Sequence, residues 1–139
     1  QFFCINTKDE LALALENRNV ERDLILEKID EYTKLLKTQE FVDRNIFTLS
    51  GGEKQAVAIT AVSMMNNEIY LFDEPSASLD KEAIQRLKNM IEILKKLGKI
   101  VIVAEHRLYY LFDSIDKLAI LTSSGGRSLF KRRIILFKN

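Results

Sequence analysis

Two adjacent carboxylates, Asp73 and Glu74, follow the apolar run Ile69–Phe72. The run has no polar alternation, which predicts a strand covered on both faces. Open α/β sheets bind their ligands at the carboxyl ends of such strands. In nucleotide hydrolysis a strand-end Asp can hold Mg²⁺, while a neighbouring acid orients or deprotonates the attacking water. We therefore expect Asp73 to be a metal ligand and Glu74 a catalytic residue, with an ordinary acidic loop as the alternative.

A second candidate site lies in the segment Leu49–Gln55, of sequence LSGGEKQ, directly before a predicted helix. Free backbone amides and the positive end of the helix dipole would face the same point as the Ser50 hydroxyl. Gly51 and Gly52 would let a phosphate approach the backbone without a Cβ in the way. The segment therefore predicts an anion site, although Ser50 with Glu53 three residues later also fits a simple capping box.

The remaining candidates lie in two loops. Pro75, the only proline, fixes the exit from the first strand, and Ser76–Asp80 leads into a helix that Asp80 could simply cap. His106, the only histidine, follows a second apolar run, Ile100–Ala104. If the two strands are neighbours, His106 lies beside the acidic pair, where an imidazole could hydrogen-bond a γ-phosphate. A structural histidine is the alternative.

The elements that must position these residues can be predicted from periodicity. Apolar residues repeat at helical spacing from Glu21 to Lys37 and again between the two strands, where Gly98 is placed to end the helix. Residues 9–40 are expected to be helical with a turn near 17–19, and a small apolar helix follows Gly52. Strand, helix, strand implies a right-handed parallel crossover. We also expect a short helix at 108–112, a strand at 118–121 and a hairpin turn at 123–126 before a last strand.

Composition limits the classes of function. The 139 residues are 47% hydrophobic, enough for one modest globular domain. The net charge of +1 provides no global field to recruit nucleic acid, and the basic tail at 127–138 is expected to be a solvated strand edge. The single cysteine allows no internal disulfide, and no apolar run approaches the roughly 20 residues that cross a bilayer.

Taken together, the motifs resemble the ATP-binding cassette (ABC) ATPase family over nearly the whole chain. LSGGEKQ looks like the signature motif, IYLFDE the Walker B strand, SASLD the D-loop and EHR the switch-histidine region. The resemblance implies ATP and Mg²⁺ as cofactors. The implied catalytic residues are Glu74 and His106, the implied metal ligand is Asp73, and the implied nucleotide-binding residues are Ser50, Gly51, Gly52, Gln55 and Asp80. Ser50 and the glycines would contact ATP held by an opposing subunit, and Asp80 would make a cross-dimer contact.

The expected fold is α/β, a partial P-loop NTPase fold in which a helical subdomain precedes a parallel sheet flanked by helices. Residues 1–139 would be a partial ABC ATPase domain, with the helical subdomain and signature at about 1–66 and the Walker B, D-loop and switch-histidine part at about 67–139. The opening QFF, DELALALEN and VAEHR look most like the energy-coupling-factor type, a peripheral ATPase at the cytoplasmic face of the cell membrane. Its implied partners are a second ATPase subunit, identical or different, and a transmembrane subunit.

One expected motif is absent from the sequence. A phosphate-binding loop needs GxxxxGK followed by Ser or Thr, and the sole Gly-Lys pair, Gly98-Lys99, is followed by Ile100. We expect the chain to begin inside a longer protein and to hydrolyse ATP negligibly by itself. Two alternatives stay open: a soluble ABC ATPase of DNA repair or chromosome maintenance, disfavoured because no long coiled coil precedes the signature, and a non-catalytic interaction remnant.

Overall fold

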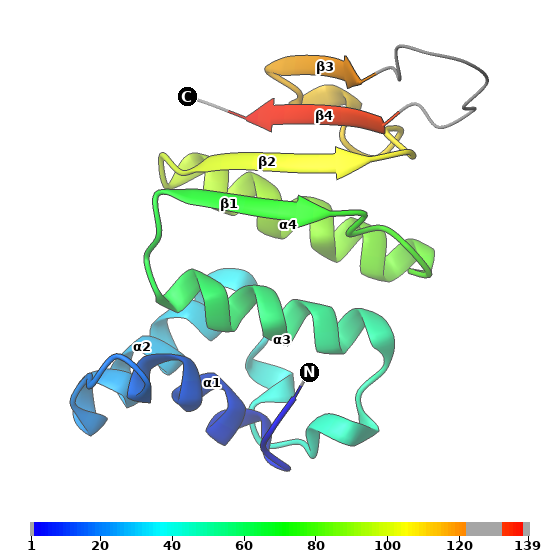
Figure 1. The fold of residues 1–139 in the computed structure, drawn as a ribbon. Coiled ribbons are helices and arrows are strands. Elements are labelled where there is room, and N and C mark those ends of the chain that lie inside the picture. Colours follow the sequence, from blue (N-terminus) through cyan, green and yellow to red (C-terminus); the bar gives the residue numbers. More distant parts are fainter. Residues whose placement is uncertain (1, 122–131, 138–139) are drawn as a thin grey trace. The chain divides into compact units, whose positions relative to one another are not determined.

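The computed structural model describes residues 2–121 and 132–137, and it divides the chain into two compact units, Gln1–Asn67 and Glu68–Asn139. The first unit is helical. It contains α1 (Thr7–Glu16), α2 (Arg22–Leu36), two short 3₁₀ helices (Gln39–Phe41 and Ile46–Thr48) and α3 (Gly51–Met64) (Figure 1). The turn predicted near residues 17–19 is confirmed, because α1 ends at Glu16 and α2 begins at Arg22.

The core of the helical unit follows the predicted periodicity. On α2 the buried apolar residues are Ile25, Ile29, Tyr32 and Leu36, the four positions that helical spacing places on one face. Phe41 and Ile46 of the 3₁₀ helices are also buried. Buried hydroxyls are paired: the Thr33 and Thr60 hydroxyls donate to carbonyls four residues earlier, and the Thr38 and Thr60 oxygens lie 3.1 Å apart. The helical unit thus buries polar atoms without leaving these hydroxyls unsatisfied.

The second unit is a sheet with one long helix. Its strands are β1 (Ile69–Asp73), β2 (Ile100–Glu105), β3 (Lys117–Leu121) and β4 (Arg132–Phe137), in the order β1-β2-β4-β3. β1 and β2 are parallel and are joined by α4 (Lys81–Lys96), whereas β4 runs antiparallel to both β2 and β3 (Figure 1). The predicted parallel crossover and the final antiparallel pair are confirmed. The turn predicted at residues 123–126 lies outside the described residues.

Two details of the second unit differ from the predictions. Only one face of β1 is buried: Tyr70 is 3% exposed, but Leu71 is 74% exposed, so the expectation of cover on both faces is wrong for the described residues. The helix predicted at 108–112 is instead a turn followed by a 3₁₀ helix at Phe112–Ser114. The Leu111 amide donates to the Leu108 carbonyl, and the Ser114 amide donates to the Leu111 carbonyl. Apolar residues spaced three apart fit such 3₁₀ turns as well as an α-helix.

α4 begins and ends as predicted. Asp80 caps its start by accepting a hydrogen bond from the Ala83 amide at 2.8 Å, and Gly98 follows its end with φ +75°. Its apolar face is buried, with Ile84, Leu87, Met90, Ile91 and Leu94 all shielded from solvent. α4 contacts β2, so the helix packs against the same crossover strand that precedes His106.

Candidate functional site

The acidic pair and the histidine meet at the carboxyl ends of β1 and β2. Asp73 pairs in register with Ala104, and the Glu74 amide donates to the Ala104 carbonyl oxygen at 2.8 Å, which carries the β1–β2 pairing one residue further. His106 Nε2 lies 3.2 Å from Glu74 Oε1, and both side chains are 41% exposed. The structure therefore brings Glu74 and His106 together where solvent or a ligand can reach both groups.

The loop after β1 departs from relaxed backbone geometry. Glu74 and Ser78 have φ values of +47° and +61°, in the left-handed region that residues with a Cβ seldom adopt. Such a conformation costs roughly 1–3 kcal/mol per residue and persists where surrounding contacts fix it. Non-glycine residues of this kind gather at ligand-binding and catalytic sites. The position of Glu74 is therefore imposed by the loop and its contacts and is not simply the relaxed continuation of β1.

Glu105, the last residue of β2, is a buried carboxylate that no motif in the sequence singles out. It is 3% exposed and accepts hydrogen bonds from the amides of Ser76, His106 and Arg107 and from the Tyr110 hydroxyl. Burial by itself raises the pKa of the Glu105 carboxyl, but the hydrogen bonds outweigh burial, so this pKa is lowered. Burial and the adjacent Glu105 raise the pKa of Tyr110. Glu105 is thus an ionised group held by neutral donors.

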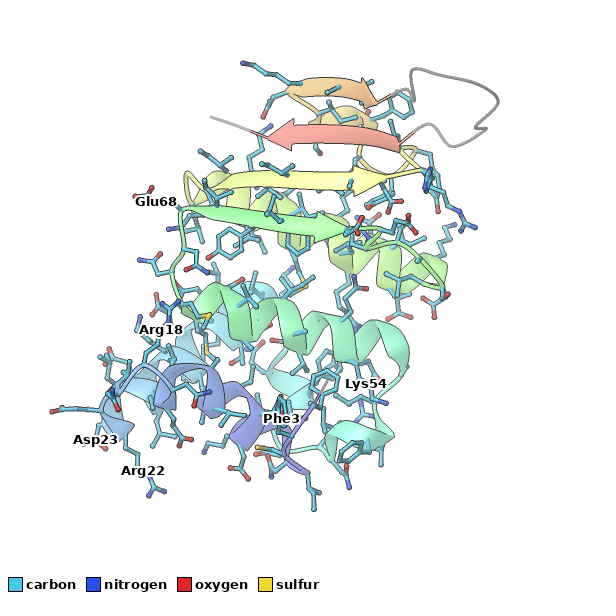
Figure 2. All side chains as sticks on the ribbon, viewed as in Figure 1. Phe3, Arg18, Arg22, Asp23, Lys54 and Glu68 are labelled. Atoms are coloured by element: carbon cyan, nitrogen blue, oxygen red, sulfur yellow. The ribbon has the colours of Figure 1, made fainter. Side chains whose placement is uncertain are left out.

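The signature segment, Leu49–Gln55, forms the loop and first turn before α3. Ser50 and Glu53 make the predicted capping box: the Glu53 amide donates to Ser50 Oγ at 3.3 Å, and the Ser50 amide donates to Glu53 Oε2 at 2.6 Å. A hydroxyl that accepts this bond keeps its own hydrogen to donate. Lys54 extends from the same turn toward the Phe47 carbonyl, at 3.5 Å (Figure 2). Capping and anion binding by Ser50 are therefore compatible.

The glycines leave the end of α3 open. A Cβ built on Gly51 would meet nothing within 4 Å, so the fold of this chain does not require glycine there. Among the described residues, no hydrogen bond is formed by the amides of Gly51 and Gly52, as expected for the first residues of a helix. The two amides and the Ser50 hydroxyl can all donate to one anion.

Arg44 is a second residue that motif spacing did not reveal. Its Nη1 lies 2.8 Å from Glu53 Oε1, while the other oxygen of Glu53 holds the Ser50 amide. The hydrogen bond from the Ser50 amide and the pairing with Arg44 both lower the pKa of Glu53. Arg44 therefore acts on the signature loop through Glu53. Its only signal in the sequence is a basic residue six positions before Ser50.

The lowered pKa of Glu53 predicts a pH-dependent stability. A carboxyl with a lowered folded-state pKa stabilises the fold above its ordinary value of 4.5, and this contribution is lost as the pH falls through the folded-state pKa. Glu53→Gln should therefore lower the free energy of unfolding by about 0.5–2 kcal/mol at pH 7, the range for a lost cap, and by less at pH 3. Chemical denaturation at both pH values measures this. Glu27→Gln, on the exposed side of α2, is the control and should change little at either pH; an equal loss for Glu53→Gln at both would contradict the prediction.

Two other predicted residues lie at or near the starts of helices. Asp80 is exposed and caps α4 through Oδ1. Gln55 is half-buried on the first turns of α3. The predicted residues thus divide between the two compact units. Asp73, Glu74 and His106 lie at the strand ends and Asp80 at the start of α4 in one unit, and the signature segment lies in the helical unit.

Asp73 is suited to a hard cation such as Mg²⁺. Its carboxylate ends β1 and is exposed beside Glu74. Within residues 2–121 and 132–137, no three His, Cys, Asp or Glu side chains converge into a metal cluster. Mg²⁺ is commonly held by one or two carboxylates together with waters and substrate phosphates, so a single strand-end Asp fits it better than it would fit a structural metal.

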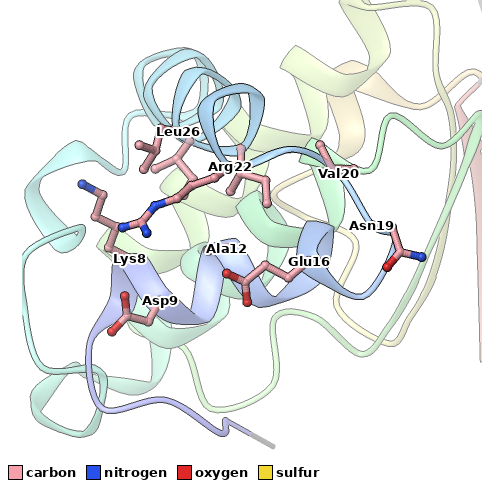
Figure 3. A pocket seen from close by; sticks show the side chains of 10 residues that line it. Lys8, Asp9, Ala12, Glu16, Asn19, Val20, Arg22 and Leu26 are labelled. Atoms are coloured by element: carbon pink, nitrogen blue, oxygen red, sulfur yellow. The ribbon is translucent and has the colours of Figure 1, made fainter.

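The helical unit also has a surface hollow of about 730 Å³ between α1 and α2. Charged side chains of both signs line it, including Lys8, Asp9, Glu16 and Arg22, with Leu26 at its edge (Figure 3).

In the described part of the chain, no helix is both long and apolar enough to span a membrane.

The sequence is similar to proteins of one family. The profile of the family described as ABC transporter matches residues 4–77. The energy-coupling factor transporter ATP-binding protein EcfA of Onion yellows phytoplasma is 33% identical over 98% of this chain and 51% of its own length. EcfA1 of Mycoplasma genitalium is 41% identical over 76% of this chain and 39% of its own length.

A solved structure shares the fold. CbiO1 from Clostridium perfringens, described as part of the ABC transporter complex CbiONQ, matches with a TM-score of 0.70 and 28% identity, covering 78% of this chain and 43% of that protein. The chain spans about half or less of the length of the curated relatives that it matches.

Proposed function

The chain belongs to the ABC transporter family, and from this premise we propose that it supplies the signature and catalytic-acid elements of an ATP-hydrolysing transport subunit. The observation that carries the proposal is the 3.2 Å contact between Glu74 Oε1 and His106 Nε2 at the ends of two parallel strands. The similarity to EcfA and to CbiO1 supports the energy-coupling-factor type, which powers uptake across a membrane.

Glu74 is the proposed general base. With one carboxylate oxygen accepting from His106 Nε2, the other can take a proton from an attacking water. His106 would orient this carboxylate and would contact a γ-phosphate bound at the same strand ends. Asp73 would hold Mg²⁺, and the ion would supply positive charge to offset the negative charge of the nucleotide's phosphates. The chain's own residues therefore position the water and the metal.

The signature segment is proposed to act on a nucleotide held by a second subunit. The Ser50 hydroxyl and the amides of Gly51 and Gly52 form a donor set suited to a γ-phosphate. The chain contains no GxxxxGK[ST] loop to wrap phosphates itself. Asp80, exposed at the start of α4, is proposed to make the cross-dimer contact. The unit Gln1–Asn67 would then be the helical subdomain and Glu68–Asn139 part of the core.

The proposed membrane partner docks on the helical unit. The hollow between α1 and α2 combines both charge signs with apolar side chains, and Leu26, which lines it, is 40% exposed. Such a surface suits a polar-flanked helix of a transmembrane subunit. The protein would then lie peripherally at the cytoplasmic face of the membrane, as a homodimer or a heterodimer. The helices before Leu49 are at most 15 residues long, which gives no support to the long-coiled-coil class of DNA-repair ATPases.

Two measurements test the proposal. We use "ATPase assembly" for this chain together with the segment or subunit that supplies the phosphate-binding loop. The chain alone should show no Mg²⁺-ATP turnover above background, whereas the ATPase assembly should hydrolyse ATP. Leu26→Asp should weaken co-purification with the membrane subunit and leave basal turnover unchanged. Turnover by the chain alone, or an ATPase assembly without turnover, would contradict the proposal.

A further inference from the structure

We propose that Glu105 is a positioning residue that fixes Glu74 and His106 relative to each other by holding the backbone next to each of them. This inference rests on the proposed function for its catalytic meaning, but the contacts that support it are independent of ATP. They all lie within the unit Glu68–Asn139.

The two oxygens of Glu105 hold different segments. Oε1 accepts from the Ser76 amide at 3.0 Å and from the Tyr110 hydroxyl at 3.1 Å. Oε2 accepts from the His106 amide at 2.9 Å and from the Arg107 amide at 3.4 Å. Oε1 is thus bound to the loop that follows β1, and Oε2 to the turn that follows β2. One rigid carboxylate spans the two segments that carry the Glu74–His106 pair.

The chain positions of these amides make the link short. Ser76 is two residues after Glu74, with the conformationally fixed Pro75 between them, and His106 donates its own amide to Glu105. The loop leaves β1 through the left-handed Glu74, a conformation that needs surrounding contacts to persist. Loss of the Glu105 anchor should let the Ser76 segment and the His106 turn move separately, which would loosen the 3.2 Å contact between Glu74 and His106.

A packing function alone does not account for a carboxylate at this position. Glu105 lies on the buried face of β2 with Val101 and Val103, where an apolar side chain would avoid the cost of burying a charge. No cationic side chain pairs with it among the described residues, so amide and hydroxyl donors compensate its charge. Such a group adds directional contacts to the strand end, which a valine could not supply.

Amide hydrogen exchange of the complete 139-residue chain tests the anchor directly. Glu105→Gln keeps the size of the side chain, but its NH₂ group cannot accept hydrogen bonds, so either orientation leaves one pair of donors without an acceptor. We expect at least one of the Ser76 and His106 amides to exchange at least tenfold faster, while the Val103 and Ile91 amides keep their rates. Unchanged exchange at Ser76 and His106, or equal acceleration at all four, would overturn the proposal.

Two further variants keep the test decisive if Glu105→Gln folds poorly. Tyr110→Phe removes one donor and leaves the three amide bonds, so Ser76 and His106 exchange should rise less than threefold. Glu105→Asp keeps the charge on a shorter side chain and should protect these amides better than Gln. A Tyr110→Phe effect as large as that of Glu105→Gln, or no recovery with Asp, would count against positioning by the carboxylate.

The functional consequence is read in the ATPase assembly. Glu105→Gln should lower kcat at least tenfold and change KM for ATP less than threefold. Both carboxylate oxygens of Glu105 bind protein groups in the proposed site, and neither contacts the nucleotide. A changed KM with unchanged kcat would overturn the positioning function. If the wild-type assembly shows no turnover while the exchange result holds, the proposed function fails and the Glu105 anchor stands, so the two claims are distinguishable.

Discussion

Replacing Glu74 by Gln should lower ATP turnover of the ATPase assembly by about 10²–10⁴-fold, the usual contribution of a general base. The substitution keeps the shape of the side chain and an oxygen that can accept from His106 Nε2, which lies 3.2 Å from Glu74 Oε1. It removes only the ability to take a proton and the negative charge. Nucleotide-bound dimers should therefore still form and should persist longer than those of the wild type, because their ATP is not consumed. Phosphate release and size-exclusion chromatography with Mg²⁺-ATP measure the two effects.

The control for this variant is Glu82→Gln on the first turn of α4. Glu82 is strongly exposed and pairs with Arg86 at 3.4 Å on the surface of α4, so turnover should not change. Thermal unfolding of the Glu74→Gln chain should also stay close to that of the wild type, because the Glu74 side chain is 41% exposed. Retained turnover in Glu74→Gln would remove Glu74 from the catalytic step, and loss of the dimers together with turnover would assign it a binding function instead.

The meeting of Glu74 and His106 could be expected from sequence because it follows from topology. Two apolar runs joined by one amphipathic helix predict parallel neighbours, and the carboxyl ends of parallel neighbours share one edge of the sheet. The register, with Asp73 opposite Ala104, then brings the residues after each strand together. The capping of α3 by Ser50 was also predictable, because a capping box depends on two residues that are only three positions apart.

Glu105 and Arg44 were not predictable because their contacts depend on tertiary folding. In the sequence, Glu105 is one acid at the end of a strand, and nothing local indicates that the Ser76 amide, 29 residues away, will bond to it. Arg44 reaches Glu53 only because the 3₁₀ helix Ile46–Thr48 turns the chain between them. Cover of a sheet face is equally non-local: Ile69 and Leu71 have the apolar character of a central strand but are exposed in the described structure.

Gly51→Asp should lower turnover of the ATPase assembly more than about 100-fold while leaving the fold intact. The new side chain meets open space, since a Cβ at Gly51 has nothing within 4 Å. An acidic residue in the first turn of α3 is also favourable for the helix, by about 0.3–1 kcal/mol. The same carboxylate would lie where the γ-phosphate of the partner's nucleotide is proposed to bind. The two negative charges would repel each other strongly in a site that excludes water. Chemical denaturation of the chain and phosphate release by the assembly separate the two effects, and Gly51→Ala, which adds the Cβ without charge, should lose less activity.

Mixed dimers decide whether the signature segment serves the partner's nucleotide. If it does, a dimer with Gly51→Asp in one subunit and Glu74→Gln in the other has both lesions in the same composite site, and the second site is intact. A dimer with both substitutions in one subunit and none in the other has one lesion in each site. The first arrangement should therefore retain up to about half of wild-type turnover if the sites act independently. The second should be inactive, because one site loses the general base, worth about 10²–10⁴-fold, and the other carries Gly51→Asp. The reverse order of activities would mean that Gly51 and Glu74 of one chain act on the same nucleotide, which would contradict the proposed division of work between subunits.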